Sequence, residues 1–170
     1  KFYHKGFVGD TDEEFSDYII EEAGITETSK VVEFGCGSGY FTNVLNNLCE
    51  VEGISNSPIN IDVCKKLYPD CNFIVADMED HEAQDKSHCI ALESFNYSNP
   101  EKTFKNAHKI LRTGGIFYMK EWMGVEDDNE KILENKQYLR DIFCYNPYKT
   151  SDMLGLAEMC GFEIVGIRNL

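Results

Sequence analysis

The sequence predicts a single α/β domain with a doubly wound, mostly parallel sheet that carries helices on both faces. Short apolar and β-branched segments alternate with amphipathic segments of helical period, which is typical of parallel sheets with crossover helices. A glycine-rich turn, residues 35–39, joins the first expected strand to a helix. With 170 residues, 42% of them hydrophobic and 27% charged, the chain can bury one sizeable core.

The expected elements follow one another without an internal repeat. A first helix over residues 11–24 stops at Gly24, and we expect residues 1–28 to form an N-terminal helical segment packed on the core. Proline opens the helices at 58–68 and 100–111, because its fixed φ suits the first helical turn. The other expected helices cover 40–48, 129–143 and 151–160, and the expected strands cover 30–34, 50–54, 72–76, 88–93, 116–122 and 162–167.

Charge and cysteine content narrow the class of protein. The formal net charge of −14 opposes binding to nucleic-acid phosphates, so we expect no DNA or RNA partner. No apolar run reaches the length of a membrane span, so no membrane partner is expected either. The seven cysteines form no C-x-x-C pair, which disfavours a disulfide framework or a metal site and favours reduced thiols in the cytoplasm. The chain starts at Lys1, so we expect it to be truncated at one or both ends.

Residues 31–40 read Val-Val-Glu-Phe-Gly-Cys-Gly-Ser-Gly-Tyr. A strand, a glycine turn and a helix expose backbone N–H groups, and glycines let a ligand approach the backbone closely. A dinucleotide fingerprint requires Gly-x-Gly-x-x-Gly, but its third glycine position holds Tyr40. Glu33 would repel a pyrophosphate and suits a ligand with a cationic amino group. Cys36 is interpreted as a small packing residue rather than a nucleophile.

The pattern acidic-x-Gly-x-Gly-x-Gly at residues 33–39 resembles motif I of the class I S-adenosylmethionine-dependent methyltransferases. Residues 111–115 and 157–162 resemble two weaker motifs of that family, before its fifth strand and at the start of its sixth. The resemblance covers nearly the whole chain and implies a Rossmann-like fold with S-adenosylmethionine as cofactor. The turn residues that it implies for cofactor binding are Glu33, Gly35, Cys36, Gly37 and Gly39.

The segment after the second expected strand points to a subgroup of that family. Residues 53–60 resemble the corresponding run of the cyclopropane fatty acid synthase and geranyl diphosphate C-methyltransferase subgroup. The resemblance implies that Ser55, Asn56 and Asn60 bind the ribose with neutral groups, where most of the family has an acidic residue. A helix-capping role for Ser55 is an equal alternative. Glu52 is an alternative ribose ligand, although strand alternation should point it away from the site.

Polar residues after the third and fourth expected strands complete the candidate site, because ligands of parallel sheets bind beyond the strand ends. The resemblance implies that Asp77 accepts a hydrogen bond from the adenine amine and that Met78 packs on the ring; a turn-capping Asp77 is the alternative. Glu93 is a candidate general base or carbocation stabiliser near the cofactor, or a residue that shapes its loop. Tyr97 offers a π face to the sulfonium or to an apolar acceptor. No metal ligands are expected.

The end of the chain departs from the family pattern. The family sheet normally closes with a seventh, antiparallel strand, but this sequence stops at Leu170, where a sixth strand should end. We therefore expect a six-stranded sheet, or a seventh strand supplied by residues beyond this sequence or by a partner chain. A homodimer is one such arrangement. We also expect residues 2–4 to fold over the cofactor, as N-terminal segments do in related enzymes.

The prediction for function is a cytoplasmic S-adenosylmethionine-dependent methyltransferase that acts on a carbon or oxygen atom of a small-molecule acceptor. Two alternatives stay open at this point. One is an oxidoreductase or epimerase that uses a nicotinamide cofactor such as NAD. The other is a non-catalytic cofactor-binding subunit or an inactive remnant of an enzyme.

Overall fold

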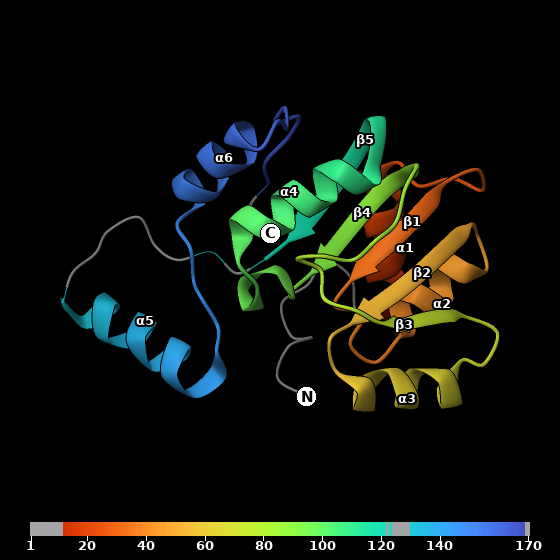
Figure 1. Cartoon of the computed structure of the whole chain (residues 1–170), viewed down its shortest axis with the longest axis horizontal. Helices are drawn as coiled ribbons and strands as arrows, with labels where there is room; N and C mark the ends of the chain where they lie inside the picture. The colour runs from red at the N-terminus through yellow and green to blue at the C-terminus, as the bar shows by residue number, and fades with distance from the viewer. Residues whose placement is uncertain (1–11, 122, 124–129, 169–170) are drawn as a thin grey trace.

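The computed structural model describes residues 12–121, 123 and 130–168, which form an α/β domain around a central sheet (Figure 1). Its helices are α1 (Asp12–Ala23), α2 (Tyr40–Asn46), α3 (Pro58–Leu67), α4 (Pro100–Ile110), α5 (Glu130–Phe143) and α6 (Thr150–Met159), with a short 3₁₀ helix η1 (Phe95–Tyr97). Its strands are β1 (Lys30–Phe34), β2 (Glu50–Ser55), β3 (Asn72–Val75), β4 (Lys86–Leu92) and β5 (Leu111–Lys120). All the expected helices and the first five expected strands are confirmed.

The described strands form one parallel sheet in the order β3-β2-β1-β4-β5. The chain builds outward from β1 to β3 and then returns past β1 to add β4 and β5. The strand order therefore reverses between β1 and β4. In open parallel sheets, ligands bind beyond the carboxyl ends of the strands at such a reversal. The topology alone thus selects the carboxyl ends of the strands, beside β1 and β4, as the place to look for a site.

Side-chain alternation along the central strands divides the core into two halves. Val31 of β1 and Ile90 of β4 face α1 and α2, whereas Val32 and Cys89 face α4 and α6, and all four are 0% exposed. Figure 1 shows α1 and α2 behind the sheet and α4 in front of it. Because β1 and β4 are covered on both faces, nearly all of their residues are buried, as in the central strands of parallel sheets. Helices on both faces confirm the doubly wound class.

The connection from β3 to β4 has no helix. Residues 76–85 run across the front of the sheet in Figure 1, past β2 and β1, to reach the start of β4. Ala76, Met78 and Ala83 of this connection pack against the core on the α4 side. The connection begins at the carboxyl end of β3, so its first residues lie on the side of the sheet where the strand order predicts a site.

The expected sixth strand at residues 162–167 is wrong. Phe162 and Ile164 pack against the α4-side core, while Val165 and Ile167 are 87% and 56% exposed, but the segment has no regular secondary structure. The alternation of a strand is present without the hydrogen-bonded ladder that defines one. Within the described residues β5 is therefore the edge of the sheet, next to β4.

Residues 111–115, which resemble a family motif before the fifth strand, lie inside β5 rather than before it. Leu111 pairs with Lys86 and Ile116 pairs with His88, so residues 112–115 leave the ladder between these two pairs. Gly114 has a φ of 76°, a conformation that glycine adopts without strain. The turn thus interrupts the strand locally. Trp122, the last residue of the expected strand, lies outside the described residues.

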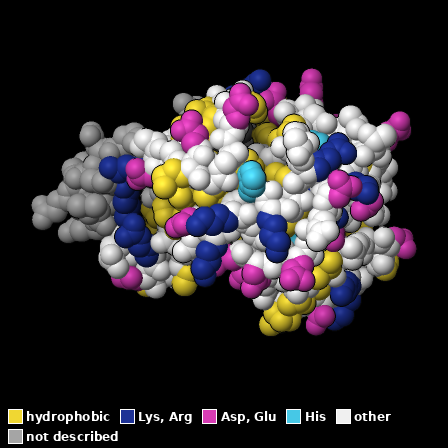
Figure 2. All heavy atoms as spheres, turned by 45° about the horizontal axis from the view of Figure 1, so that its top comes forward, with side chains coloured by type: hydrophobic (Ala, Val, Ile, Leu, Met, Phe, Trp, Pro, Cys, Tyr) yellow, Lys and Arg dark blue, Asp and Glu magenta, His cyan; other side chains and the backbone are white. Residues whose placement is uncertain are grey.

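The surface mixes charges of both signs. Figure 2 shows acidic and basic side chains interspersed on one face of the molecule. On α4, Lys105 pairs with Glu101 at 2.5 Å and Lys102 pairs with Glu79 at 3.2 Å. No helix within the described residues is both long enough and apolar enough to cross a membrane.

Candidate functional site

A cavity of about 250 Å³ lies at the carboxyl ends of β1, β2, β3 and β4, beside the reversal of strand order. Segments that follow four different strands form its walls. The lining residues are Gly35, Gly37, Ile54, Ser55, Asn56, Asn60, Ala76, Asp77, Met78, Glu79, Glu93, Ser94, Tyr97 and Ser98. The structure thus brings all the predicted site residues to one cavity except Glu33, Cys36 and Gly39.

The glycine turn after β1 folds against the end of β2. The backbone nitrogens of Gly35 and Cys36 both donate hydrogen bonds of 2.9 Å to the carbonyl of Ile54. Gly35 has a φ of 73°, and a Cβ there would lie 2.4 Å from the Cβ of Ser94, so only glycine fits between the ends of β1 and β4. Gly39, with a φ of 81°, begins α2 outside the cavity. The glycines of this turn therefore serve the packing of the strand ends as well as the cavity.

Glu33 lies on the α2 side of the sheet and does not line the cavity. Its side chain is only 4% exposed, and its carboxylate accepts a hydrogen bond from the hydroxyl of Thr42 on α2. Burial raises the pKa of Glu33 to about 7, although the hydrogen bonds from Thr42 oppose that shift. A direct contact between this carboxyl and a ligand amine, which the sequence suggested, is therefore absent from the cavity as it stands.

Cys36 is a packing residue in the described structure. It is 4% exposed, does not line the cavity, and lies beside Cys64 of α3, whose thiol donates a hydrogen bond of 3.3 Å to the carbonyl of Gly37. Burial raises the pKa of the Cys36 thiol, so it stays protonated at neutral pH. This agrees with its interpretation as a small packing side chain. All seven cysteines are free.

Ser55 at the end of β2 lines the cavity, and the helix cap next to it is a different serine. The hydroxyl of Ser57 accepts a hydrogen bond of 3.3 Å from the backbone nitrogen of Asn60 at the start of α3. The hydroxyl of Ser55 instead accepts one of 3.2 Å from the backbone nitrogen of Ser57. Asn56 and Asn60 line the cavity beside it. Glu52, the alternative ribose ligand, does not line the cavity; its carboxylate contacts His81 and Lys86 instead.

Asp77 follows β3, caps a turn and also lines the cavity. Its Oδ1 accepts a hydrogen bond of 3.0 Å from the backbone nitrogen of Glu79, and its carbonyl accepts one of 2.9 Å from that of His81, which forms a turn. Its side chain also lines the cavity together with Met78. The methyl carbon of Met78 would lie 3.6 Å from a Cβ at position 35, so this side chain reaches the glycine turn.

Glu93 and Tyr97 lie on the wall formed by the segment after β4. Glu93 has a φ of 54°, which is unusual for a residue other than glycine, and its backbone nitrogen donates a hydrogen bond of 2.8 Å to the carbonyl of Lys120. The carboxylate of Glu93 forms an ion pair with the Lys120 side chain. Tyr97 is 55% exposed, and its ring meets that of Tyr145 edge to face with centroids 5.3 Å apart. Residues 2–4, expected to cover the cofactor, lie outside the described residues.

A family model described as a methyltransferase domain matches residues 32–119, which is just over half of the chain. The chain belongs to this methyltransferase domain family. The match runs from β1 to the end of β5 and so includes every segment that lines the cavity. It favours the methyltransferase prediction over the nicotinamide-dependent alternative.

Two curated relatives are methyltransferases by name. The chain is 26% identical over 110 residues to protein 235L of Invertebrate iridescent virus 6, which is named as a methyltransferase; the alignment covers 61% of this chain and 41% of the relative. It is 25% identical over 128 residues to a sterol 24-C-methyltransferase of Debaryomyces hansenii, covering 67% of this chain and 34% of the relative. The methyltransferase domain thus spans less than half the length of both relatives.

Solved structures show the same fold. The cyclopropane synthase MmaA2 of Mycobacterium tuberculosis superposes with a TM-score of 0.80 at 16% identity, covering 96% of this chain and 66% of that one. A geranyl diphosphate methyltransferase in complex with S-adenosylmethionine superposes with a TM-score of 0.72 at 17% identity, covering 86% and 66%. The methyltransferase domain therefore has the class I methyltransferase fold, as the sequence motifs implied.

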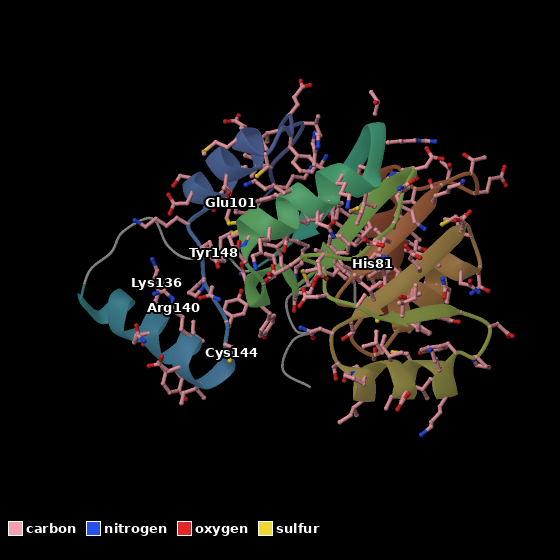
Figure 3. The ribbon with its side chains drawn as sticks, in the orientation of Figure 1. His81, Glu101, Lys136, Arg140, Cys144 and Tyr148 are labelled. Carbon is pink, nitrogen blue, oxygen red and sulfur yellow. The ribbon has the colours of Figure 1, made fainter. Side chains whose placement is uncertain are left out.

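The structure adds residues that sequence reasoning missed. Glu121, directly after β5, accepts a hydrogen bond of 2.5 Å from the backbone nitrogen of Phe95, and burial raises its pKa to about 7. The rule that strand ends carry site residues could have found it. Tyr145 lies between α5 and α6 and meets Tyr97 from a distant part of the chain, and no sequence signal indicated that contact. Figure 3 shows Tyr148 of the same segment between α5 and α4.

The lining of the cavity is acidic. Asp77, Glu79 and Glu93 contribute carboxyl groups, and the lining residues named above include neither lysine nor arginine. Glu79 pairs with Lys102 and Glu93 with Lys120, both from outside the lining. Within the described residues no cluster of His, Cys, Asp and Glu could hold a metal ion. Such a site favours a neutral or cationic ligand over a phosphate.

Proposed function

We propose that this methyltransferase domain binds S-adenosylmethionine in the cavity and transfers its methyl group to a carbon or oxygen atom of a small-molecule acceptor. The observation that carries the proposal is the acidic cavity at the reversal of strand order. A nicotinamide dinucleotide would bring a pyrophosphate to the glycine turn, where the cavity offers carboxylates and no lysine or arginine from its described lining. S-adenosylmethionine has no phosphate, and its sulfonium and amino group bring positive charge to the acidic cavity instead.

The residues present fit the cofactor. Gly35 lacks the Cβ that would fill the space between the ends of β1 and β4, which leaves room for the methionine part. Ser55, Asn56 and Asn60 offer neutral hydrogen-bonding groups for the ribose, and Asp77 offers an acceptor for the adenine amine. When bound, S-adenosylmethionine supplies a methyl group activated by a good leaving group.

The protein residues then have to align the acceptor and exclude water. In this proposal the exposed ring of Tyr97 offers a π face to the reacting end of the cavity. The carboxylate of Glu93 takes the proton of an acceptor that must lose one, and Lys120 holds that carboxylate in place. No metal ion is needed in this scheme, since the leaving group is already activated.

The charge, the cysteines and a named relative support a small acceptor, a cytoplasmic location and a carbon acceptor atom. A net charge of −14 supports a small molecule over a nucleic acid as acceptor. Seven free cysteines support a reducing, cytoplasmic location. The name of the sterol 24-C-methyltransferase supports carbon as the acceptor atom.

Calorimetric titration with S-adenosylhomocysteine and, separately, with NAD tests the cofactor. We expect heat with the first and none with the second; heat with NAD alone overturns the proposal. Asp77→Ala should weaken binding of S-adenosylhomocysteine about 10-fold to 100-fold, because it removes a charged acceptor. Asp80→Ala, an exposed aspartate of the same turn, is the matched control and should bind as the wild type does.

A transfer assay with labelled S-adenosylmethionine and a panel of small acceptors tests the activity. With an accepted substrate, Glu93→Gln should lower the rate about 100-fold or more if this carboxylate moves a proton. An unchanged rate would assign Glu93 to loop structure. Binding of S-adenosylhomocysteine without transfer to any acceptor would favour a non-catalytic subunit.

A further inference from the structure

The turn that carries the acidic wall of the cavity is held from outside the cavity. Asp77, Met78 and Glu79 all line the cavity and belong to one turn, residues 77–81, which we call the 77–81 turn. Asp77 closes this turn with its own side chain and carbonyl. A turn at the start of a ten-residue connection without a helix needs further contacts to keep one position.

Asn106 of α4 supplies two of those contacts. Its side-chain amide nitrogen donates hydrogen bonds of 3.1 Å to the carbonyl of Met78 and 3.1 Å to the carbonyl of His81. Because both partners are carbonyl acceptors, the nitrogen and not the oxygen of the amide must face the turn. Asn106 is 7% exposed and is not one of the residues that line the cavity. Asn106 therefore links two residues of the 77–81 turn from a position outside the cavity lining.

The far end of the turn is anchored to the sheet. The Nε2 of His81 lies 3.2 Å from the Oε1 of Glu52 on β2, and the same oxygen lies 3.2 Å from the Nζ of Lys86 on β4. His81 and Lys86 are 9% and 7% exposed. Figure 3 shows His81 on the connection that crosses the front of the sheet. This buried group fixes His81, and Asn106 links His81 to Met78.

We propose that Asn106 is a positioning residue of the cofactor site, which sets the affinity for S-adenosylmethionine by holding the 77–81 turn in the conformation that binds it. This inference rests on the proposed function. A side chain that only stabilises the competent form of a turn lowers the apparent affinity in proportion to the population that is lost. Loss of two hydrogen bonds to backbone carbonyls should leave about a tenth of the molecules competent.

Asn106→Ala should therefore weaken binding of S-adenosylhomocysteine about 10-fold and raise the KM for S-adenosylmethionine similarly, with kcat nearly unchanged. Ala107→Gly is the control for a general loss of stability, because glycine destabilises the same helix and the change touches neither carbonyl. A general loss of stability would affect both variants alike. Equal affinities of the two variants, or a fall in kcat with an unchanged KM, would overturn the proposal.

Hydrogen exchange separates this inference from the proposed function. In the ligand-free Asn106→Ala protein, the backbone amides of Glu79, Asp80 and His81 should exchange faster than in the wild type and in Ala107→Gly. If the wild type binds no S-adenosylhomocysteine, the proposed function fails, and the inference about affinity fails with it, whatever the exchange rates show. If the wild type binds and exchange in the variant is unchanged, only the role of Asn106 is refuted. Asn106→Ser, which is too short to reach both carbonyls, replaces Asn106→Ala if that variant does not fold.

Discussion

The side-chain amide of Asn96 donates a hydrogen bond of 2.7 Å to the hydroxyl of Tyr145. A second bond joins the same segments, because the backbone nitrogen of Asn146 donates to the carbonyl of Asn96 at 2.9 Å. Asn96 belongs to η1, next to the cavity residue Tyr97, whereas Tyr145 follows α5. The segment between α5 and α6 is thereby attached to the wall where the acceptor is expected to bind.

Tyr145→Phe should lower the free energy of unfolding by about 1–2 kcal/mol, because it removes the hydroxyl that pairs with a buried amide and keeps the ring. Tyr145→Ala should cost more, since it also removes the edge-to-face contact with Tyr97. Urea denaturation measures both values. Tyr138→Phe, on the exposed side of α5, serves as control. A Phe variant as stable as the wild type would show that the hydrogen bond contributes nothing.

Two alanine substitutions in the glycine turn should differ in cost. At both Gly35 and Gly37 the φ is positive, and alanine pays about 1–2 kcal/mol for that conformation. At Gly35 the new Cβ would also lie 2.4 Å from the Cβ of Ser94, whereas at Gly37 nothing lies within 4 Å. Gly35→Ala should therefore destabilise more than Gly37→Ala, by about 1–3 kcal/mol in thermal or urea unfolding.

A double-mutant cycle isolates the clash. Adding Ser94→Gly to Gly35→Ala removes the opposing Cβ, so the double variant should be more stable than the sum of the two single effects predicts. Strict additivity would mean that the strand ends move apart to admit the methyl group.

The pKa of Glu33 makes the stability of the protein depend on pH. Burial raises the pKa of this carboxyl to about 7 in the folded protein from an ordinary value of 4.5, so the folded protein holds a proton that the unfolded chain releases between these values. Stability should fall by about 3 kcal/mol as the pH rises from 4.5 to 7. Glu33→Gln keeps an acceptor for Thr42 and should remove this loss. Urea titrations at several pH values measure it, with exposed Glu27→Gln as control.

His88 should produce the opposite dependence. Burial lowers the pKa of His88 below its usual value, although the hydrogen bond between Nε2 and the carbonyl of Ala23 opposes this. The unfolded chain then binds the proton more readily, so this residue's contribution to stability falls as the pH drops below 6.5. His88→Gln should flatten that part of the pH profile when the unfolding free energy is measured at several pH values. An unaltered slope in His88→Gln would contradict the assignment.

Patterns within a few neighbouring residues were sufficient to predict most of the helices and strands. The incorrect prediction of a sixth strand has a physical cause. The helix after Ser57-Pro58 and the buried strand at Val31 and Val32 depend on caps, proline and apolar period, all of which are properties of neighbouring residues. Residues 162–167 have the alternation of a strand, but a strand also needs a partner that offers its hydrogen bonds. The residues of the segment itself do not determine whether such a partner strand is present.

The candidate site likewise contains residues that the sequence could place and residues whose position depends on tertiary contacts. Ser55, Asp77, Glu93 and Tyr97 come after strands, and because the strand ends of a parallel sheet gather on one side, the sequence could bring all four to one place. The cavity includes all four, whereas their roles were implied by the family resemblance. The direction of Glu33 could not be foreseen, since it depends on the hydroxyl of Thr42 from α2. Glu121 was overlooked because the expected strand ran to residue 122 and so included it, whereas β5 ends at Lys120.

The sequence by itself determined the family, the order of elements and the edge of the sheet where the site lies, because glycine spacing, caps and apolar period act over a few residues. The tertiary structure alone decided which carboxyl groups face the cavity, which are buried with raised pKa values, and which side chains hold the walls from behind. Those properties depend on burial and on contacts such as that of Asn106 with Met78, between residues far apart in the chain. Desolvation and hydrogen bonding are set by what surrounds a group, and only folding brings those surroundings together.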